Sequence, residues 1–314
     1  MYMKFIINIT KKFSDFFLIW KNLINILKIN SSESGILIYL EYYSEWNFFF
    51  KIAEELNKNN INFIIVSSEK YNKNIKNLNN NFFYIGSGSA RTVLFRLINV
   101  KLFFISLTNI DNLYLKKSIH KIDYVYIFHS IVSSHRIYED KAFDNYNTIF
   151  CVGDHHYQEL REREKIFNLP KKKLIKFGYP RLESLIDSFE ILKKKKRNDP
   201  IKVLIAPTWG ESSLLNYDLE SIIENLLKKE IQVIIRYHPM SLKNDKIKIK
   251  QIYKSFKNNT LFSVDNDLSS DLNIISSNIL ITEWSGIAME FAFSTNQPVI
   301  FIDTPPKIKN SSWK

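Results

Sequence analysis

The sequence lacks a second cysteine, an apolar run long enough to span a bilayer, and a recognisable secretory leader. Its single cysteine, Cys151, excludes an internal disulfide framework and a cysteine-based zinc site. Cys151 stands in an apolar stretch, so we expect a small buried core residue, in keeping with a reducing cytoplasm. No apolar run reaches the ~20 residues of a membrane-spanning helix, and the start lacks the apolar core and small-residue cleavage site of a signal peptide.

Signals for metal and for nucleic acid are missing as well. No cluster of paired carboxylates calls for a divalent cation, and His155 and His156, adjacent on a helix, point about 100° apart. We therefore expect no metal and no cofactor. The formal net charge of +12 suits nucleic acid, an anionic membrane or a phosphate-rich substrate; the alternative is that it reflects only a solvated surface. Because the basic runs lack interleaved aromatics, we do not expect a nucleic-acid partner.

The pattern of apolar runs indicates an α/β protein. The 314 residues suffice for about two domains of roughly 150 residues each, and a hydrophobic fraction of 45% indicates a packed globular chain. Short apolar runs alternate with amphipathic stretches, as in a parallel sheet covered by helices on both faces. Expected strands cover residues 36–40, 61–66, 82–85, 102–107, 124–128 and 148–152, then 203–206, 232–236, 279–282 and 298–302.

We expect two Rossmann-like, doubly wound parallel-sheet lobes behind an N-terminal amphipathic helical segment. That segment covers residues 1–30, the first lobe residues 31–192, and the second lobe residues 201–314. Between the lobes, residues 193–200 form a charge run closed by a proline, which is typical of a linker. Ligands of such sheets bind at the carboxyl ends of the strands, so the cleft between the lobes is the expected site.

The N-terminal segment has two readings. Residues 11–28 combine apolar and aromatic side chains with lysines at intervals. Such a helix either packs on the first lobe or lies in a membrane interface, with its basic groups among the lipid headgroups.

A histidine stands directly behind the apolar run at residues 124–128. His129 would project from the carboxyl end of a strand, where a side chain with an ordinary pKa of about 6.5 can act as a general base. The plainer alternative is a histidine that only hydrogen-bonds the loop backbone. Ser130 and His135 follow in the same loop and are further candidates for the cleft.

Two later strand ends carry residues suited to phosphate. Arg236 and His238 lie on the same side of an extended chain, where they can hold phosphate oxygens. The strand expected at residues 279–282 ends at Thr282 and leads through a polar turn into an apolar helix. In that turn Ser285 suits the N-cap position, and a helix start favours an anion such as a pyrophosphate.

Further candidates stand in the same turn and in two other segments of the sequence. Gly286 lets a ligand approach the backbone closely, and Glu283 stands in the same turn. The run Ala-Pro-Thr-Trp places Thr208 and Trp209 behind the first strand of the second lobe. Gly-Tyr-Pro-Arg ends at Arg181, which is either a cleft residue or part of a simple turn and helix start.

In order along the chain, these segments are the strand-end His, Gly-x-Pro-Arg, Ala-Pro-Thr-Trp, His-Pro and Thr-acid-aromatic-Ser. Together they resemble the CDP-glycerol glycerophosphotransferase family, the membrane-associated enzymes of teichoic-acid-type polymer synthesis, over residues 124–303. The resemblance implies a GT-B fold. It also implies transfer of a polyol phosphate from a CDP-alcohol to a hydroxyl of a polymer or lipid-linked acceptor, with release of CMP. A cytoplasmic enzyme with peripheral contact to an anionic membrane is expected.

Carried over by position, the resemblance makes His129 the base and His238 a contact of the donor phosphates. It places Thr282 and Ser285 in the phosphate-binding turn.

The sequence also departs from the family's pattern. Ser130 stands where a Gly is usual, Glu283 where an Asp is usual, and Gly286 where a second Ser is usual. Members usually continue well beyond residue 303, so we expect a fragment, a short variant or a protein with a changed substrate.

Two alternatives from other classes stay open at this point. One is a glycosyltransferase or epimerase of the same fold that uses a UDP-sugar. Glycosyltransferases of this fold often carry two glutamates with seven residues between them, whereas Glu283 and Glu290 have six. The other alternative is a non-catalytic binding homologue.

Overall fold

The computed structural model describes residues 2–28, 35–70, 82–112, 114–194, 200–268 and 270–310, with side chains from residue 14. The chain forms two compact units: unit 1 comprises Met1–His129 and Tyr138–Pro180, and unit 2 comprises Ser130–Ile137 and Arg181–Lys314. Each contains a parallel sheet, which confirms the predicted fold class. The predicted domain limits stay predictions, and residues 195–199 of the expected linker lie outside the described residues.

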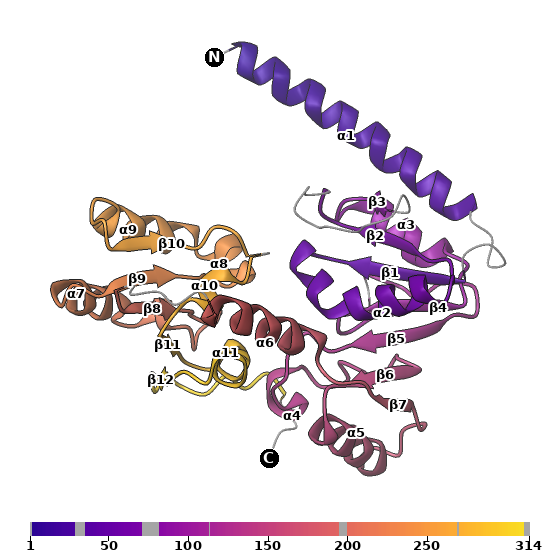
Figure 1. Ribbon diagram of the computed structural model, residues 1–314. Helices are drawn as coiled ribbons and strands as arrows, with labels where there is room; N and C mark the ends of the chain where they lie inside the picture. Colours follow the sequence, from indigo (N-terminus) through magenta and orange to yellow (C-terminus); the bar gives the residue numbers. More distant parts are fainter. Residues whose placement is uncertain are drawn as a thin grey trace. The chain divides into compact units, whose positions relative to one another are not determined.

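Unit 1 contains a seven-stranded sheet in the order β3-β2-β1-β4-β5-β6-β7, and every neighbouring pair is parallel. The strands are β1 (Ile36–Leu40), β2 (Ile64–Ser67), β3 (Phe82–Tyr84), β4 (Leu102–Ile105), β5 (Asp123–Ile127), β6 (Thr148–Cys151) and β7 (Lys173–Lys176). The helices are α1 (Tyr2–Lys28), η1 (Tyr43–Glu45), α2 (Trp46–Lys58), α3 (Ser89–Leu97) and α5 (Asp154–Ile166) (Figure 1).

Unit 2 contains a five-stranded parallel sheet in the order β10-β9-β8-β11-β12. The strands are β8 (Lys202–Ile205), β9 (Gln232–Ile235), β10 (Phe262–Val264), β11 (Ile279–Thr282) and β12 (Val299–Phe301). The helices are α4 (Ser134–Ile137), α6 (Pro180–Lys193), η2 (Leu214–Asn216), α7 (Leu219–Lys228), α8 (Pro239–Asn244), α9 (Lys246–Phe256), α10 (Leu272–Ile275) and α11 (Ile287–Thr295).

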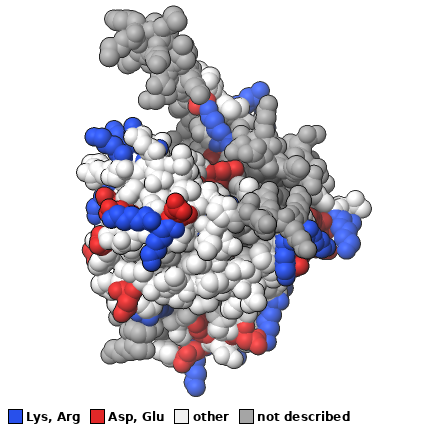
Figure 2. Space-filling model, turned by 60° about the vertical axis from the view of Figure 1, so that its left-hand side comes forward, with Lys and Arg blue, Asp and Glu red and all other residues white. Residues whose placement is uncertain are grey.

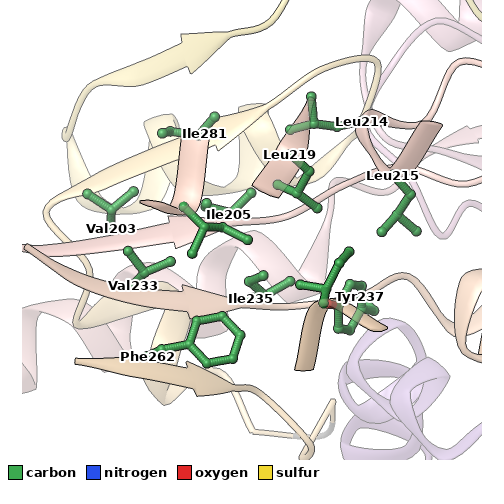
Figure 3. Close-up of a cluster of buried hydrophobic side chains, with 12 residues drawn as sticks. Val203, Ile205, Leu214, Leu215, Leu219, Val233, Ile235, Tyr237, Phe262 and Ile281 are labelled. Atoms are coloured by element: carbon green, nitrogen blue, oxygen red, sulfur yellow. The ribbon is translucent and has the colours of Figure 1, made fainter. Parts of the chain in front are cut away.

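The strands of unit 2 are apolar because both faces of the sheet are covered. Along β8, Val203 and Ile205 join a core beneath α7 and α9 (Figure 3). Their neighbour Leu204 joins the opposite core with Phe291 of α11. Each such side chain stabilises the fold by about 1.5–3 kcal/mol relative to exposure. This packing fixes the sheet, so the loops at its carboxyl edge start from rigid strands.

Helix α1 packs on unit 1 through its C-terminal half. Leu23 and Ile26 are buried, and the Asn22 side-chain amide donates a hydrogen bond to the Tyr84 carbonyl oxygen at 2.8 Å. Nearer the N-terminus of the same helix, Phe16 and Phe17 are exposed. The predicted helical segment is therefore confirmed, and among the described residues no helix has the length and apolar character needed to cross a bilayer.

The surface carries charges of both signs. Figure 2 shows Lys and Arg side chains interspersed with Asp and Glu side chains on the face that it presents. Pairs such as Lys228 with Glu224, at 2.8 Å, neutralise part of the basic excess. On that face the net charge is therefore not gathered into one patch.

The structure departs from the sequence-based expectations in three places. Strand β7 was not expected, because its ends are exposed lysines, and the three-residue strand β10 was too short to predict. The prediction that Ser285 caps this helix is wrong. Helix α11 begins at Ile287, its N-cap residue is Gly286, and no side chain caps it.

Cys151 is buried, as predicted, and burial raises the pKa of its thiol to about 12.

Candidate functional site

The candidate site lies at the carboxyl edge of the unit 2 sheet. Strands β8, β9, β11 and β12 run parallel, so the loops that follow them emerge at the same edge. These loops carry the predicted residues Thr208, Trp209, His238, Glu283 and Ser285. The structure therefore brings the predicted unit 2 residues to one edge.

Glu283 holds the loop behind β8 in place. Its Oε1 accepts hydrogen bonds from the backbone N–H groups of Thr208 at 2.7 Å and Leu214 at 2.8 Å. The side chain is buried, and desolvation raises the pKa of its carboxyl against the lowering effect of these donors. Next to it, the Thr282 hydroxyl donates to the Ala206 carbonyl oxygen at 2.6 Å. Both residues thus position Thr208 and Trp209.

His238 presents a hydrogen-bond donor at this edge. Its Nδ1 accepts the backbone N–H of Met240 at 3.1 Å and caps α8, which Pro239 begins. A neutral imidazole that accepts at Nδ1 carries its proton on Nε2. The ring lies 5.9 Å from that of Trp209, centroid to centroid. The Nε2–H is therefore suited to donate to an oxygen of a bound anion.

The turn before α11 packs against residues 130–137. The Ser130 Oγ lies 2.7 Å from the position that a Cβ on Gly286 would take. Close by, the Arg136 guanidinium lies over the Trp284 ring, 4.4 Å from its centroid, and the His135 carbonyl oxygen accepts from the Asn310 amide at 2.7 Å. Of the predicted cleft residues, Ser130 thus lies beside the α11 start, and His135 contacts the residues behind β12.

The two predicted arginines are buried in internal ion pairs of unit 2. Arg236 pairs with Asp265 at 2.5 Å and donates to two backbone carbonyl oxygens. Arg181 pairs with Glu290 at 2.9 Å and with Asp271 at 3.0 Å. That Arg236 also contacts phosphate stays a prediction.

His129 belongs to unit 1, two residues behind β5, and its side chain is exposed. The Tyr179 hydroxyl donates to its carbonyl oxygen at 3.3 Å. Its ring lies 6.4 Å from that of Phe48 and 5.8 Å from that of Tyr138, centroid to centroid. The loop is therefore fixed while the imidazole faces solvent, as a base that meets a substrate requires.

Sequence reasoning missed two sets of polar residues. Lys307 and Lys309 lie 4.2 and 3.8 Å from the Trp209 ring centroid; no strand end marked them, since they follow β12 by several residues. At the carboxyl edge of the unit 1 sheet, burial raises the pKa of Glu45 to about 7. Its neighbour Glu41 pairs with Arg91 at 2.6 Å. Glu41 stands directly behind β1, so the strand-end rule that selected His129 would have found it.

Residues 108–304, more than half of the chain, match the family described as CDP-Glycerol:Poly(glycerophosphate) glycerophosphotransferase. The chain belongs to this family. The match spans every loop of the unit 2 edge described above except the last residues behind β12. It confirms the predicted activity, a glycerophosphotransferase that uses CDP-glycerol, and does not favour the UDP-sugar and non-catalytic alternatives. No curated protein sequence matches the chain.

Solved structures resemble the chain in fold. The wall teichoic acid polymerase TagF, soaked with CDPG, has a TM-score of 0.58 at 13% identity and covers 96% of this chain and 78% of its own. The UDP-GlcNAc 2-epimerase of Methanocaldococcus jannaschii has a TM-score of 0.58 at 15% identity, and the match covers 85% of this chain and 83% of the epimerase. The UDP-GlcNAc 2-epimerase of Neisseria meningitidis has a TM-score of 0.59 at 14% identity, and the match covers 87% of this chain and 83% of the epimerase. Because polymerase and epimerases score alike, the fold does not choose between their chemistries.

Proposed function

We propose that this glycerophosphotransferase binds the diphosphate of CDP-glycerol at the carboxyl edge of the unit 2 sheet and transfers glycerol phosphate to a polymer hydroxyl. The observation that carries the proposal is the shared edge of His238, Thr208, Trp209 and the start of α11. The positive end of the α11 dipole favours anions, while the N–H groups of Ala288 and Met289 there already donate to the carbonyl oxygens of Ser285 and Gly286. At Gly286 the place that a side chain would fill is taken by the Ser130 hydroxyl, so the close approach of a ligand to this backbone stays a prediction.

In this proposal His238 donates its Nε2–H to a phosphate oxygen of the donor. The charge that develops on the leaving CMP is stabilised by this hydrogen bond and by the α11 start at Ser285 and Gly286. Thr282, Glu283 and Arg236 act by fixing the loops that carry these groups. Such preorganised donors cost little reorganisation during the reaction.

His129 is the proposed base. It accepts the proton of the acceptor hydroxyl, whose oxygen forms a bond to the β-phosphorus of CDP-glycerol. The bond from that phosphorus to the bridging oxygen breaks, and the electron pair leaves with CMP. Its position just behind an apolar strand, within the residues that match the family, supports this role.

The nucleotide released tests this function. The purified chain is incubated with a glycerophosphate acceptor and either CDP-glycerol or UDP-GlcNAc, and the nucleotides are separated by chromatography. We expect CMP from CDP-glycerol and no release of UDP from UDP-GlcNAc. Release of UDP alone would contradict the proposal and restore the UDP-sugar alternative.

We also propose that α1 rests on an anionic membrane. Phe16, Phe17 and Leu18 are 56, 68 and 44% exposed, and Lys21 lies on the same half of the helix. Aromatic side chains that enter the acyl boundary beneath basic groups bind such surfaces.

Sedimentation with vesicles tests this contact. The variant Phe16→Ser with Phe17→Ser should lose binding to phosphatidylglycerol vesicles, whereas Ile119→Ser with Ile166→Ser should keep it. The control removes two exposed apolar side chains elsewhere in unit 1, which are 59 and 66% exposed. Equal binding by both double variants would contradict the proposal.

A further inference from the structure

The segment behind β12 is fixed at both of its ends on unit 2. We call residues 304–310 the strap. At its start, the Thr304 hydroxyl donates to the Ser212 carbonyl oxygen at 2.9 Å, and its own carbonyl oxygen accepts from the Trp284 ring N–H at 2.8 Å. At its end, the Lys309 N–H donates to the Arg136 carbonyl oxygen at 3.0 Å. The residues between these anchors are therefore held over the sheet edge.

Two lysine ammonium groups of the strap share one aromatic ring. Lys307 Nζ lies 4.2 Å and Lys309 Nζ 3.8 Å from the centroid of the Trp209 ring. Lys307 Nζ also lies 3.1 Å from the Thr208 hydroxyl oxygen, to which it donates. Attraction to the face of the ring favours each cation, although the ring itself carries no formal charge. The arrangement thus concentrates like charge at the candidate site.

The carboxylate that attracts Lys307 is already engaged by backbone groups. In the described part of the chain, Lys307 has no ion-pair partner, and the carboxylate that attracts it is that of Glu283. Glu283 Oε1 is already engaged by two backbone N–H groups. Burial, and next the charge of Lys309, lower the pKa of Lys307 to about 8. Holding two such cations together costs free energy, which a bound anion would recover.

We propose that Lys307 and Lys309 form an anion subsite that takes the diphosphate of the nucleotide donor. Trp209 contacts both ammonium groups and the Thr208 hydroxyl accepts from Lys307, while the His238 ring lies 5.9 Å from that of Trp209, centroid to centroid. Two ammonium groups match the two phosphates of a nucleoside diphosphate as point charges. The assignment of the diphosphate rests on the proposed function, whereas the anion subsite itself rests on the strap geometry.

Titration calorimetry with inorganic pyrophosphate and with CDP-glycerol tests the subsite. The variant Lys307→Met with Lys309→Met keeps much of the apolar contact with Trp209 and removes both charges. The control, Lys254→Met with Lys257→Met, removes two charges from exposed positions on and behind α9. Relative to the control, we expect the strap variant to bind both ligands about 10- to 100-fold more weakly, as for lost charge-assisted hydrogen bonds.

The single variant Lys309→Met guards against a folding defect, because this side chain is exposed. It should melt with the control and still lose part of the pyrophosphate affinity. Equal affinities in the strap and control variants would overturn the subsite while leaving CMP release intact. Tighter binding by the strap variant would also overturn it, since the lysines would then compete with the donor.

The outcome for the subsite is separable from that for the proposed function. Lysine-dependent pyrophosphate binding without any CMP release from CDP-glycerol would support the subsite and contradict the proposed function. Absence of pyrophosphate binding by the unmodified chain would overturn the subsite, whatever nucleotide is released.

Discussion

The hydroxyl oxygen of Ser130 lies 2.7 Å from the place where a Cβ on Gly286 would stand. Gly286 has ordinary right-handed backbone angles, with φ −63° and ψ −23°. A side chain at this position is therefore opposed by its neighbour and not by its own backbone. The two residues are coupled, and the coupling sits at the start of α11.

The first prediction follows from this coupling. Gly286→Ala should lower the free energy of unfolding by roughly 0.5–1.5 kcal/mol, because the Ser130 hydroxyl must leave its present rotamer to make room. Adding Ser130→Gly should recover most of the loss, because it removes the opposing hydroxyl. Urea unfolding of both single variants and the double variant measures the coupling. Gly88→Ala is the control, since nothing lies within 4 Å of its added Cβ; strictly additive effects at 130 and 286 would contradict the prediction.

Removal of the Glu283 carboxylate should loosen the loop behind β8. Glu283→Ala leaves the backbone N–H groups of Thr208 and Leu214 without their acceptor, at roughly 1–3 kcal/mol for each buried donor. Glu283→Gln keeps an acceptor oxygen, so its unfolding free energy should lie nearer that of the unmodified chain. Chemical denaturation compares the two variants. An equal loss of unfolding free energy in both variants would contradict this prediction. It would mean that the negative charge of Glu283, and not its acceptor oxygen, holds the loop.

The affinity for pyrophosphate should fall as pH rises through about 8. The pKa of Lys307 is lowered from 10.5 to about 8, with Lys309 adding to the effect of burial and Glu283 opposing it. The ammonium is therefore lost in a pH range where an exposed lysine stays charged, and anion binding weakens with it. Because the folded chain releases this proton more readily than the unfolded chain, the contribution of Lys307 to stability rises between pH 8 and 10.5.

Calorimetry between pH 7 and 9.5 checks this dependence. Binding above pH 8 should take up protons, visible as a dependence of the heat on the buffer's ionisation enthalpy. In the variant Lys307→Met, the affinity for pyrophosphate should be as weak at the low end of this pH range as at the high end. A profile unchanged in that variant would exclude Lys307 as the titrating group.

The ion pair of Arg236 and Asp265 allows a structural role to be separated from ligand binding. Arg236→Met leaves a buried carboxylate unpaired and should cost roughly 3–5 kcal/mol of stability. Asp265→Asn disturbs the same pair from its other side. If Arg236 only positions the loop, both variants should weaken pyrophosphate binding to a similar extent. Loss of binding in Arg236→Met alone would make Arg236 a ligand residue.

Much of the sheet architecture was predictable, because the period of apolar residues reports burial directly. The strands at Ile36–Leu40 and Ile279–Thr282 have the bounds that the sequence indicated. Strand β7 was missed, since an edge strand with lysines at both ends has no apolar run. Single-sequence patterns thus find buried elements and pass over exposed ones.

The candidate site was predictable only in part. Strand ends identified His238, Thr208 and Trp209, because parallel strands deliver their loops to one edge. The role of Glu283 as an acceptor for two backbone N–H groups depends on tertiary folding, and so does the place of Lys307 over Trp209. Neither follows from spacing along the chain.

Steady-state release of CMP from CDP-glycerol by two histidine variants tests the account most directly. His129→Ala should lower kcat by about 10²–10⁴-fold with little change in KM for the donor, as for a lost general base. His238→Ala should raise that KM as well, because a donor-phosphate contact is lost. His120→Ala, at an exposed position of unit 1, should match the unmodified chain. Turnover by His129→Ala and His238→Ala equal to that of His120→Ala would contradict the account.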